Sequence, residues 1–109
     1  MYRCKITVLK RLANQDVIAA HMGEEYSSRD LAPCPNFTDG QEFIAESPGV
    51  VPDEFCAWAW AGIHKEIVAI MNGGDFRPWV KQPGTAIACC TDGFRPVVFR
   101  IERIDDEIN

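Results

Sequence analysis

The sequence predicts a single α+β domain, a two-layer sandwich in which one long helix packs on a mainly antiparallel sheet. Three observations support this prediction: strict alternation of apolar residues at 2–9, a helical apolar stripe within 52–74, and an Asp-Gly turn between two strand-like segments after residue 84. A small curled barrel capped by the long helix is the alternative arrangement. The 109 residues suffice for one domain, 1–109, that can bury its own core.

Composition and charge restrict the class of function. The chain has 16 acidic and 11 basic residues, a formal net charge of −5, whereas a protein that binds nucleic acid is expected to show the opposite balance. No apolar run of the sequence approaches the ~20 residues of a membrane span, and the charged start of the chain does not resemble a signal peptide. We therefore expect a cytoplasmic protein that binds neither nucleic acid nor membranes.

The first half of the chain predicts two strands separated by a short helix and a long loop. Residues 2–9 alternate apolar and polar side chains, as in a strand with one buried face. Residues 14–23 have helical character and end in glycine, which predicts a short helix. The polar, proline-containing segment 24–40 is typical of a loop, and segment 41–46 of a short strand.

The strongest pattern is the helix predicted within 52–74. Pro52, Asp53 and Glu54 are typical of a helix start, and two glycines at the other end are typical of its stop. Apolar side chains recur at helical spacing and form one stripe, which consists of Cys56, Trp60, Ile63, Ile67 and Ile70. Because such a stripe must be covered, we expect this helix to lie on the sheet.

The C-terminal segments 85–90 and 95–104 predict a β-hairpin around an Asp-Gly turn at 92–93. If these two residues form the whole turn, Ala88 pairs with Val97 across the hairpin. The face that carries Val97 is apolar, so we expect it to face the helix. The residues of the first hairpin strand on the same face are small, which would let the helix approach the sheet closely.

The five cysteines are an odd number in a chain that shows no sign of secretion, so structural disulfides are not expected. Because neighbouring strand residues point to opposite faces, Cys89 and Cys90 are not expected to serve one site. We expect Cys90 to pack beneath the helix and Cys89 to face the other way; a longer turn would exchange the two faces. Cys4 lies on the apolar face of its strand and is expected in the core.

The predicted catalytic residues are Cys89, Asp92 and Cys56. Asp92 follows Cys89 closely, and a carboxyl beside a thiol can serve as an acid or a base. The alternative is that Asp92 only forms the turn, which Asp-Gly favours. Cys56 lies in the first turn of the predicted helix, where backbone N–H groups stabilise a thiolate. It also belongs to the apolar stripe, so a place in the core is the alternative.

The predicted substrate-binding residues are Cys34, Trp58, Trp79 and Arg95. Cys34 stands between two prolines, which hold the backbone extended and rigid. Trp58 projects off the apolar stripe and Trp79 lies in a loop, so both are candidates for the wall of a pocket for a flat apolar ligand. Arg95 would supply a cation that stabilises a neighbouring thiolate.

Together these residues predict a small-molecule site at one edge of the sheet, where a thiol or a carboxyl acts on an organic substrate. Two alternatives stay open. One is a cysteine-rich metal or redox module, although no CxxC-type spacing is present and no metal ligand is assigned. The other is a structural protein without chemistry, such as a homodimer joined through a sheet edge. No nucleotide-binding motif occurs, so the cofactor is left unassigned.

Four segments of the chain also resemble a family of small prokaryotic proteins of unassigned function. They are YRCKITVLKR at 2–11, APCPNFTDGQEFI at 32–44, DEFCAWAWAGIHKEI at 53–67 and PGTAIACCTDGFRPVVFRIERI at 83–104. The resemblance covers nearly the whole chain, and its motifs are Cys-Pro, Cys-x-Trp and Cys-Cys-Thr-Asp-Gly. It implies the same cysteines as candidate site residues, and it implies no reaction and no cofactor.

Overall fold

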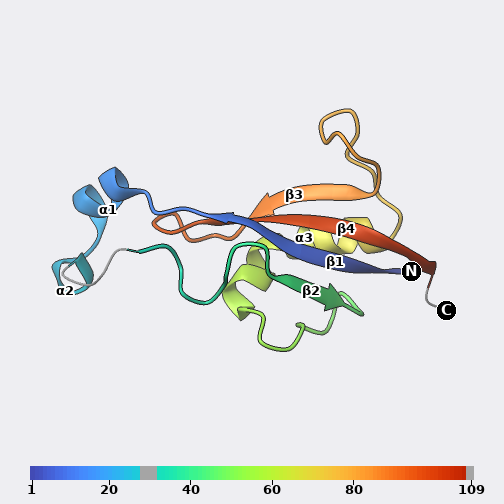
Figure 1. The fold of residues 1–109 in the computed structure, drawn as a ribbon, viewed down its shortest axis with the longest axis horizontal. Coiled ribbons are helices and arrows are strands. Elements are labelled where there is room, and N and C mark those ends of the chain that lie inside the picture. The colour runs from blue at the N-terminus through green and yellow to red at the C-terminus, as the bar shows by residue number, and fades with distance from the viewer. Residues whose placement is uncertain (28–31, 108–109) are drawn as a thin grey trace.

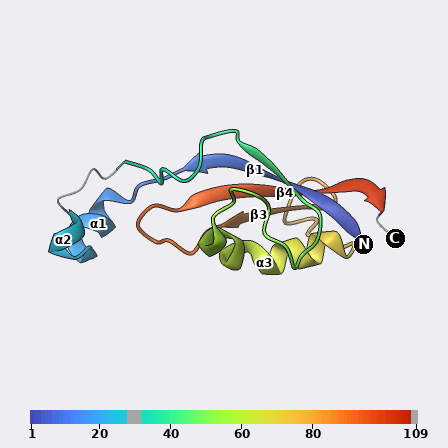
Figure 2. The ribbon, with the colours of Figure 1, turned by 90° about the horizontal axis from the view of Figure 1, so that it is seen from below.

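The computed structural model describes residues 1–27 and 32–107 and shows an open antiparallel sheet with a long helix on one face (Figures 1 and 2). In chain order the elements are β1 (Tyr2–Arg11), α1 (Gln15–His21), α2 (Glu24–Ser27), β2 (Glu42–Ala45), α3 (Ala57–Met71), β3 (Thr85–Cys89) and β4 (Val97–Glu107). The four strands have the order β2-β1-β4-β3. The predicted α+β sandwich with a C-terminal hairpin is confirmed. The barrel alternative is wrong, because the sheet ends in two separate edge strands, β2 and β3.

β1 lies in the middle of the sheet and provides one wall of the core. Ile6 pairs with Phe43 of β2 on one side and with Ile101 of β4 on the other. The alternation predicted for this strand is confirmed, because Cys4, Ile6 and Val8 are almost completely buried on the helix side. A period of two residues is what a strand with one covered face requires.

α3 begins later than the sequence predicts, at Ala57, with Cys56 as its N-cap. The N–H of Phe55 donates to the carbonyl of Pro52 at 3.1 Å and closes a turn ahead of the helix. Within this turn Glu54 has a φ of 65°, the left-handed region, which does not continue an α-helix. The prediction that the acidic residues occupy the first helical turn is therefore wrong, and Cys56 lies at the boundary between turn and helix.

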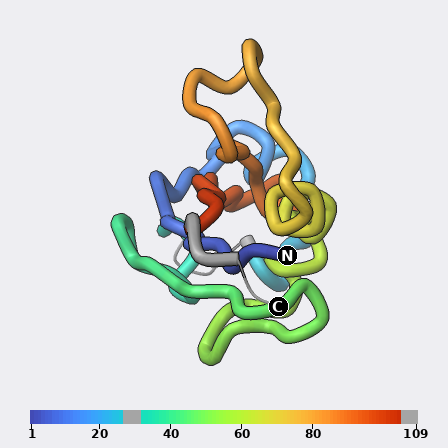
Figure 3. Tube along the Cα trace, turned by 90° about the vertical axis from the view of Figure 1, so that its right-hand side faces the viewer, coloured from blue at the N-terminus to red at the C-terminus, as the bar shows by residue number. Residues whose placement is uncertain are grey.

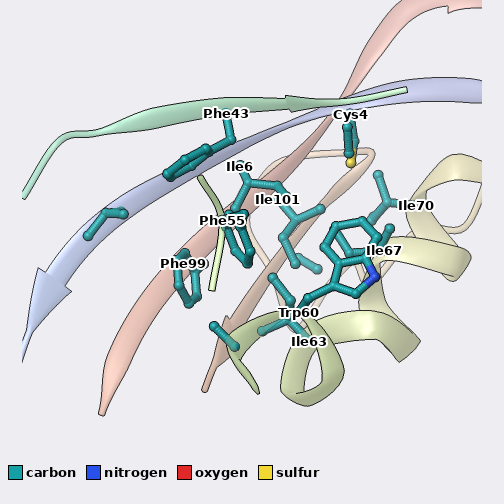
Figure 4. Packing of buried hydrophobic residues seen from close by; sticks show 14 of the residues in the cluster. Cys4, Ile6, Phe43, Phe55, Trp60, Ile63, Ile67, Ile70, Phe99 and Ile101 are labelled. Atoms are coloured by element: carbon teal, nitrogen blue, oxygen red, sulfur yellow. The ribbon is translucent and has the colours of Figure 1, made fainter. Parts of the chain in front are cut away.

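The apolar stripe of α3 packs on the sheet as predicted. Beyond the N-cap its members are buried, with exposed fractions of 0–7%: Trp60, Ile63, Ile67 and Ile70. Figure 4 shows these side chains between α3 and the central strands, which contribute Ile6 and Ile101. Full burial of one such aliphatic side chain contributes about 1.5–3 kcal/mol, so this layer is a main source of the stability of the domain.

Four phenylalanine rings form the part of the core next to the start of α3. Phe43 meets Phe55 edge-on with 4.8 Å between ring centroids, and Phe37 meets Phe99 with 5.3 Å. Edge-to-face pairs of this kind add about 0.5–1.5 kcal/mol to the free energy of area burial. Phe37 belongs to the long predicted loop. Its burial anchors that loop to the core and places residues 34–36 beside the start of α3.

The hairpin joins β3 to β4 with Ala88 opposite Phe99 and Cys89 opposite Val98. The predicted two-residue turn is wrong, because the connecting loop spans 90–96. The pairing differs from the predicted one by two residues. A shift by an even number leaves every side chain on its predicted face, so Cys89 lies on the outer face of the sheet, as expected.

The wide loop of the hairpin has a local cause. Gly93 does not take the positive φ that a two-residue Asp-Gly turn requires. Instead, Asp92 Oδ1 accepts hydrogen bonds from the backbone N–H groups two and three residues later, at 2.9 and 3.2 Å. The returning chain pairs with the segment after β1, where the N–H of Leu12 donates to the carbonyl of Pro96 at 2.9 Å.

Two segments lie outside the sandwich. α1 and α2 follow one another beyond one end of the sheet, and α2 occupies the start of the segment predicted as loop (Figure 1). The loop that connects α3 to β3, residues 72–84, projects from the body of the domain (Figure 3). Among the helices of the described ranges, none has the length and apolar character needed to cross a membrane.

Candidate functional site

A cavity of about 130 Å³ lies at the start of α3, between this helix, the segment before β2 and the β3–β4 loop. Its apolar wall comes from Phe37, Ala59 and Val97. The residues with chemical functions in its lining are Cys34, Asn36, Cys56, Trp58, Cys90, Asp92 and Arg95. Three thiols that are far apart in the sequence therefore meet at one cavity, because the Phe37 anchor, the N-terminus of α3 and the hairpin loop converge there.

Five of the seven residues predicted for the site line this cavity, namely Cys34, Cys56, Trp58, Asp92 and Arg95. The structure does not bring Cys89 and Trp79 to it. Cys89 is exposed on the outer face of the sheet, and Cys90 occupies the position in the cavity that the prediction gave to Cys89. Trp79 is exposed on the loop between α3 and β3 and lines other hollows of the surface.

Cys56 is placed by the start of α3. It is the N-cap residue, its side chain makes no capping hydrogen bond, and it is half-buried. The side-chain amide of Asn36 donates to Cys56 Sγ over 4.0 Å, a long contact that sulfur permits. An N-cap side chain lies next to the partial positive charge of the helix start. The thiol is thus held between the helix end and a neutral hydrogen-bond donor.

Cys34 is placed by its loop. The guanidinium of Arg11 donates to the carbonyl of Cys34 at 3.1 Å and to Asp39 Oδ1 at 3.0 Å. These two bonds tie the loop to the end of β1 on either side of the Phe37 anchor. The flanking prolines restrict the backbone further. The thiol itself is half-buried against the core.

Cys90 is placed by two hydrogen bonds with Val97 and by a close contact with α3. Its N–H donates to the carbonyl of Val97 at 3.1 Å, and the N–H of Val97 donates to Cys90 Sγ at 3.2 Å. On the other side the chain passes close to Gly62 of α3, where an added Cβ would lie 3.0 Å from Thr91 Cγ2. A Cβ at this helical position would press on the loop, so Gly62 lets the loop lie close to α3 beside the cavity although it carries no side chain.

Asp92 and Arg95 form the polar rim of the cavity. Asp92 uses Oδ1 to hold the loop through its two backbone hydrogen bonds. Its Oδ2 lies 3.9 Å from Nε of Arg95, so the two opposite charges largely offset each other. Asp92 thus both holds the loop of the hairpin and lines the cavity.

The two cysteines outside the cavity are poor nucleophiles. Burial raises the pKa of the Cys4 thiol to about 12. Partial desolvation of its sulfur raises the pKa of Cys89, and the neighbouring Cys90 raises it further, through charge and through a hydrogen bond between the two side chains. Because the thiolate is the reactive form, these positions do not favour thiol chemistry at neutral pH.

Sequence reasoning missed Asn36 and Cys90, which line the cavity, and Gly62, which lets the hairpin loop lie close to α3. A lone glycine in the middle of a strongly helical segment is the one sequence signal that points to a close approach. For Cys90 the predicted face was right, but the cavity on that face was not visible in the sequence. Within residues 1–27 and 32–107, no group of three His, Cys, Asp or Glu side chains is arranged to hold a metal ion.

Comparison with protein-family models, with curated proteins and with solved structures finds no match for this chain. The function is therefore inferred from the geometry of the cavity and from its chemical groups.

Proposed function

We propose that the protein binds a small, uncharged, mostly apolar organic molecule in the cavity at the start of α3. The observation that supports this most is the convergence of three free thiols from separate segments, Cys34, Cys56 and Cys90, on one half-buried hollow. No disulfide joins the cysteines of the described chain, so cross-linking does not account for their meeting.

The lining determines the chemistry of the ligand. Apolar walls favour an apolar body, and the Asn36 amide is one neutral hydrogen-bonding group placed to orient it. The Asp92–Arg95 pair supplies no net charge to the rim. A dry cavity of ~150 Å³ holds a benzene molecule, so a hollow of about 130 Å³ suits a single ring or a short branched chain. Thiols are soft, polarizable groups that pack well against such a ligand.

Any covalent chemistry would use the cavity thiols. The pKa values of Cys4 and Cys89 are raised, so those thiols stay protonated at neutral pH. Cys56 has the position best suited to a nucleophile, because it is the N-cap residue of α3 and lines the hollow where a ligand would sit. In this proposal Cys56 keeps the reactive role that the sequence predicts for it, and Cys90 takes the role predicted for Cys89.

Thiol labelling of the native protein tests the proposal. We expect iodoacetamide, a small reagent, to modify Cys56 and Cys90. A maleimide on a polyethylene glycol chain is too large to enter the cavity and should modify the exposed Cys89 in preference, but slowly, because the raised pKa of Cys89 leaves little thiolate. Cys4 should react only after unfolding. Peptide mass spectrometry identifies the modified positions.

Ligand protection and matched variants complete the test. Benzyl alcohol, a neutral single-ring probe, should slow the labelling of Cys56 and Cys90 and leave Cys89 unaffected. Cys90→Ser should weaken that protection at Cys56, whereas Cys89→Ser, a change at the adjacent residue outside the cavity, should not. If the cavity thiols are inert until the protein unfolds, or if benzyl alcohol protects nothing, the hollow is ordinary core and the proposal is wrong.

Membership of the family that the sequence resembles stays a prediction.

A further inference from the structure

A second hollow lies on the opposite side of the sheet from the cysteine cavity. It has a volume of about 550 Å³, within the range of ~300–1,000 Å³ typical of small-molecule sites. Its floor is the outer face of the sheet, where β3, β4 and β1 contribute Ile87, Arg100 and Leu9. Its wall is the loop between α3 and β3, which Figure 3 shows projecting from the body of the domain.

The wall of this groove has a defined shape. Arg103 ties both ends of the loop, because its guanidinium donates to the carbonyl of Gly74 at 3.1 Å and its backbone N–H donates to the carbonyl of Gly84 at 2.9 Å. Within the loop the guanidinium of Arg77 grips the carboxylate of Asp75 at 2.7 and 2.9 Å. The groove is therefore present before any ligand arrives.

The apolar surface of the groove is unusually exposed. Trp79 is 88% exposed, Ile87 47% and Leu9 41%. A large aromatic ring in this position is the kind of residue that dominates the free energy of binding when a partner covers it. Three large apolar side chains on one hollow thus offer a surface for the apolar part of a ligand.

The charged residues that line the groove are all basic. Its lining contains Lys81 and Arg100 and no carboxylate, although the whole chain has a net charge of −5. Glu102 offsets part of the Arg100 charge, because Oε1 accepts from Arg100 Nε at 3.0 Å, and the same oxygen lies 3.8 Å from Lys5 Nζ. Lys81 forms no ion pair in the part of the chain that the structure describes. The groove is thus complementary to an anion.

We propose that this groove is a second binding site, for an organic anion with a flat apolar body and one carboxylate. The apolar body lies on Ile87 and Leu9 and against the Trp79 ring, and the carboxylate meets Lys81 and Arg100. This site is separate from the cysteine cavity, which has a neutral rim and lies on the other face of the sheet. It also gives a role to Trp79, which does not reach the predicted site.

Titration with 2-naphthoate, followed by amide NMR shifts of the full chain, tests the proposal. We expect shifts at Ile87 and Lys81 and at the Trp79 indole N–H. The neutral isostere 2-naphthamide should bind about two- to fivefold more weakly, the effect of an exposed ion pair. Trp79→Ala should weaken naphthoate binding about two- to tenfold, because it removes the aromatic wall.

Matched charge variants distinguish a contact within the groove from a general effect of the charge of the protein. Lys81→Glu should weaken naphthoate binding about two- to fivefold or more, whereas Lys10→Glu, the same charge change at an exposed residue outside the lining, should leave it unchanged. Protein alkylated by iodoacetamide at the cysteine cavity should still bind naphthoate, so this test does not depend on the function proposed above. Equal binding of the amide, equal effects of the two lysine variants, or an absence of shifts at the groove would each overturn the proposal.

Sedimentation velocity tests whether a second copy of the chain covers the groove. We expect the protein at the concentrations of the titration to sediment as one species that Trp79→Ala does not change. If the wild type is a dimer and Trp79→Ala is a monomer, the groove is covered by a second copy of the chain, and the small-molecule proposal is wrong.

Discussion

Replacing Gly62 by alanine tests the contact that shapes the cysteine cavity. Gly62 lies in α3, and a Cβ there would lie 3.0 Å from Thr91 Cγ2, 3.1 Å from the Thr91 nitrogen and 3.4 Å from Cys90 Cα. Comfortable contacts between such atoms begin at about 3.5 Å, so the loop must move by roughly half an ångström. Two of the three neighbours are backbone atoms, which do not move independently of the hairpin.

Two effects of opposite sign decide the outcome of Gly62→Ala. Alanine in place of glycine stabilises a helix interior by about 1 kcal/mol. Overpacking against a fixed neighbour costs about 1–3 kcal/mol. We therefore expect the free energy of unfolding to fall by about 0–2 kcal/mol, the difference between the two.

The assay is urea denaturation of Gly62→Ala beside a propensity control in the same helix. Ala61 is exposed, so Ala61→Gly measures the effect of helix propensity alone. It should lower the free energy of unfolding by about 1 kcal/mol. The lifted loop should also make Cys90 react faster with iodoacetamide in Gly62→Ala. If Gly62→Ala instead stabilises the protein by as much as Ala61→Gly destabilises it, the loop does not press on α3 and the reasoning about the cavity is refuted.

Three further changes test the loop, the core and the surface. Gly84→Ala should lower the free energy of unfolding by about 1–2 kcal/mol in urea denaturation, because Gly84 has a φ of 60° and a Cβ would meet the Arg103 guanidinium at 2.9 Å; a loss below about 0.5 kcal/mol would contradict this. The pKa of Cys4 is raised from 9.0 to about 12, so the buried, protonated thiol makes its full contribution to the stability of the fold below pH 9. This contribution falls as the pH rises, by about 1.4 kcal/mol at pH 10. Cys4→Val should flatten this alkaline limb of the stability curve, and an unchanged limb would show that another group causes it. Hydrogen bonds from Arg77 lower the pKa of Asp75, so the pair stabilises the fold above the unfolded pKa of the carboxyl and loses this effect as the pH falls through the lower folded value. Asp75→Asn should therefore reduce the loss of stability in acid, as thermal melts between pH 5 and pH 2 measure; an identical acid limb in the variant would argue against the pair.

Much of the fold could be predicted because its elements are amphipathic over their whole length. The alternation before Arg11 and the stripe from Trp60 to Ile70 each leave one face that must be buried. Two such faces in one small domain pack on each other, which is why the helix-on-sheet sandwich was predictable.

The turns could not be predicted to the same precision, because turn residues permit several conformations. Asp92 and Gly93 are typical of a two-residue hairpin turn, yet Asp92 holds a wider loop through its side chain. Asp53 and Glu54 are typical of a helix start, yet Glu54 takes a left-handed conformation and delays α3 to Ala57. Local preferences of this size, below about 1–2 kcal/mol, are overridden by packing of the neighbouring core.

The candidate site shows the same division between local pattern and tertiary contact. The sequence by itself determined that Cys89 and Cys90 face opposite sides, since this follows from strand alternation. Which side each faces depended on the register of the hairpin. Only the tertiary structure decided that the cavity lies on the Cys90 face and that Trp79 lines other hollows, away from it. The physical reason is that a cavity is a space between segments distant along the chain. Its position depends on how closely they pack, here on the room that Gly62 leaves for the hairpin loop.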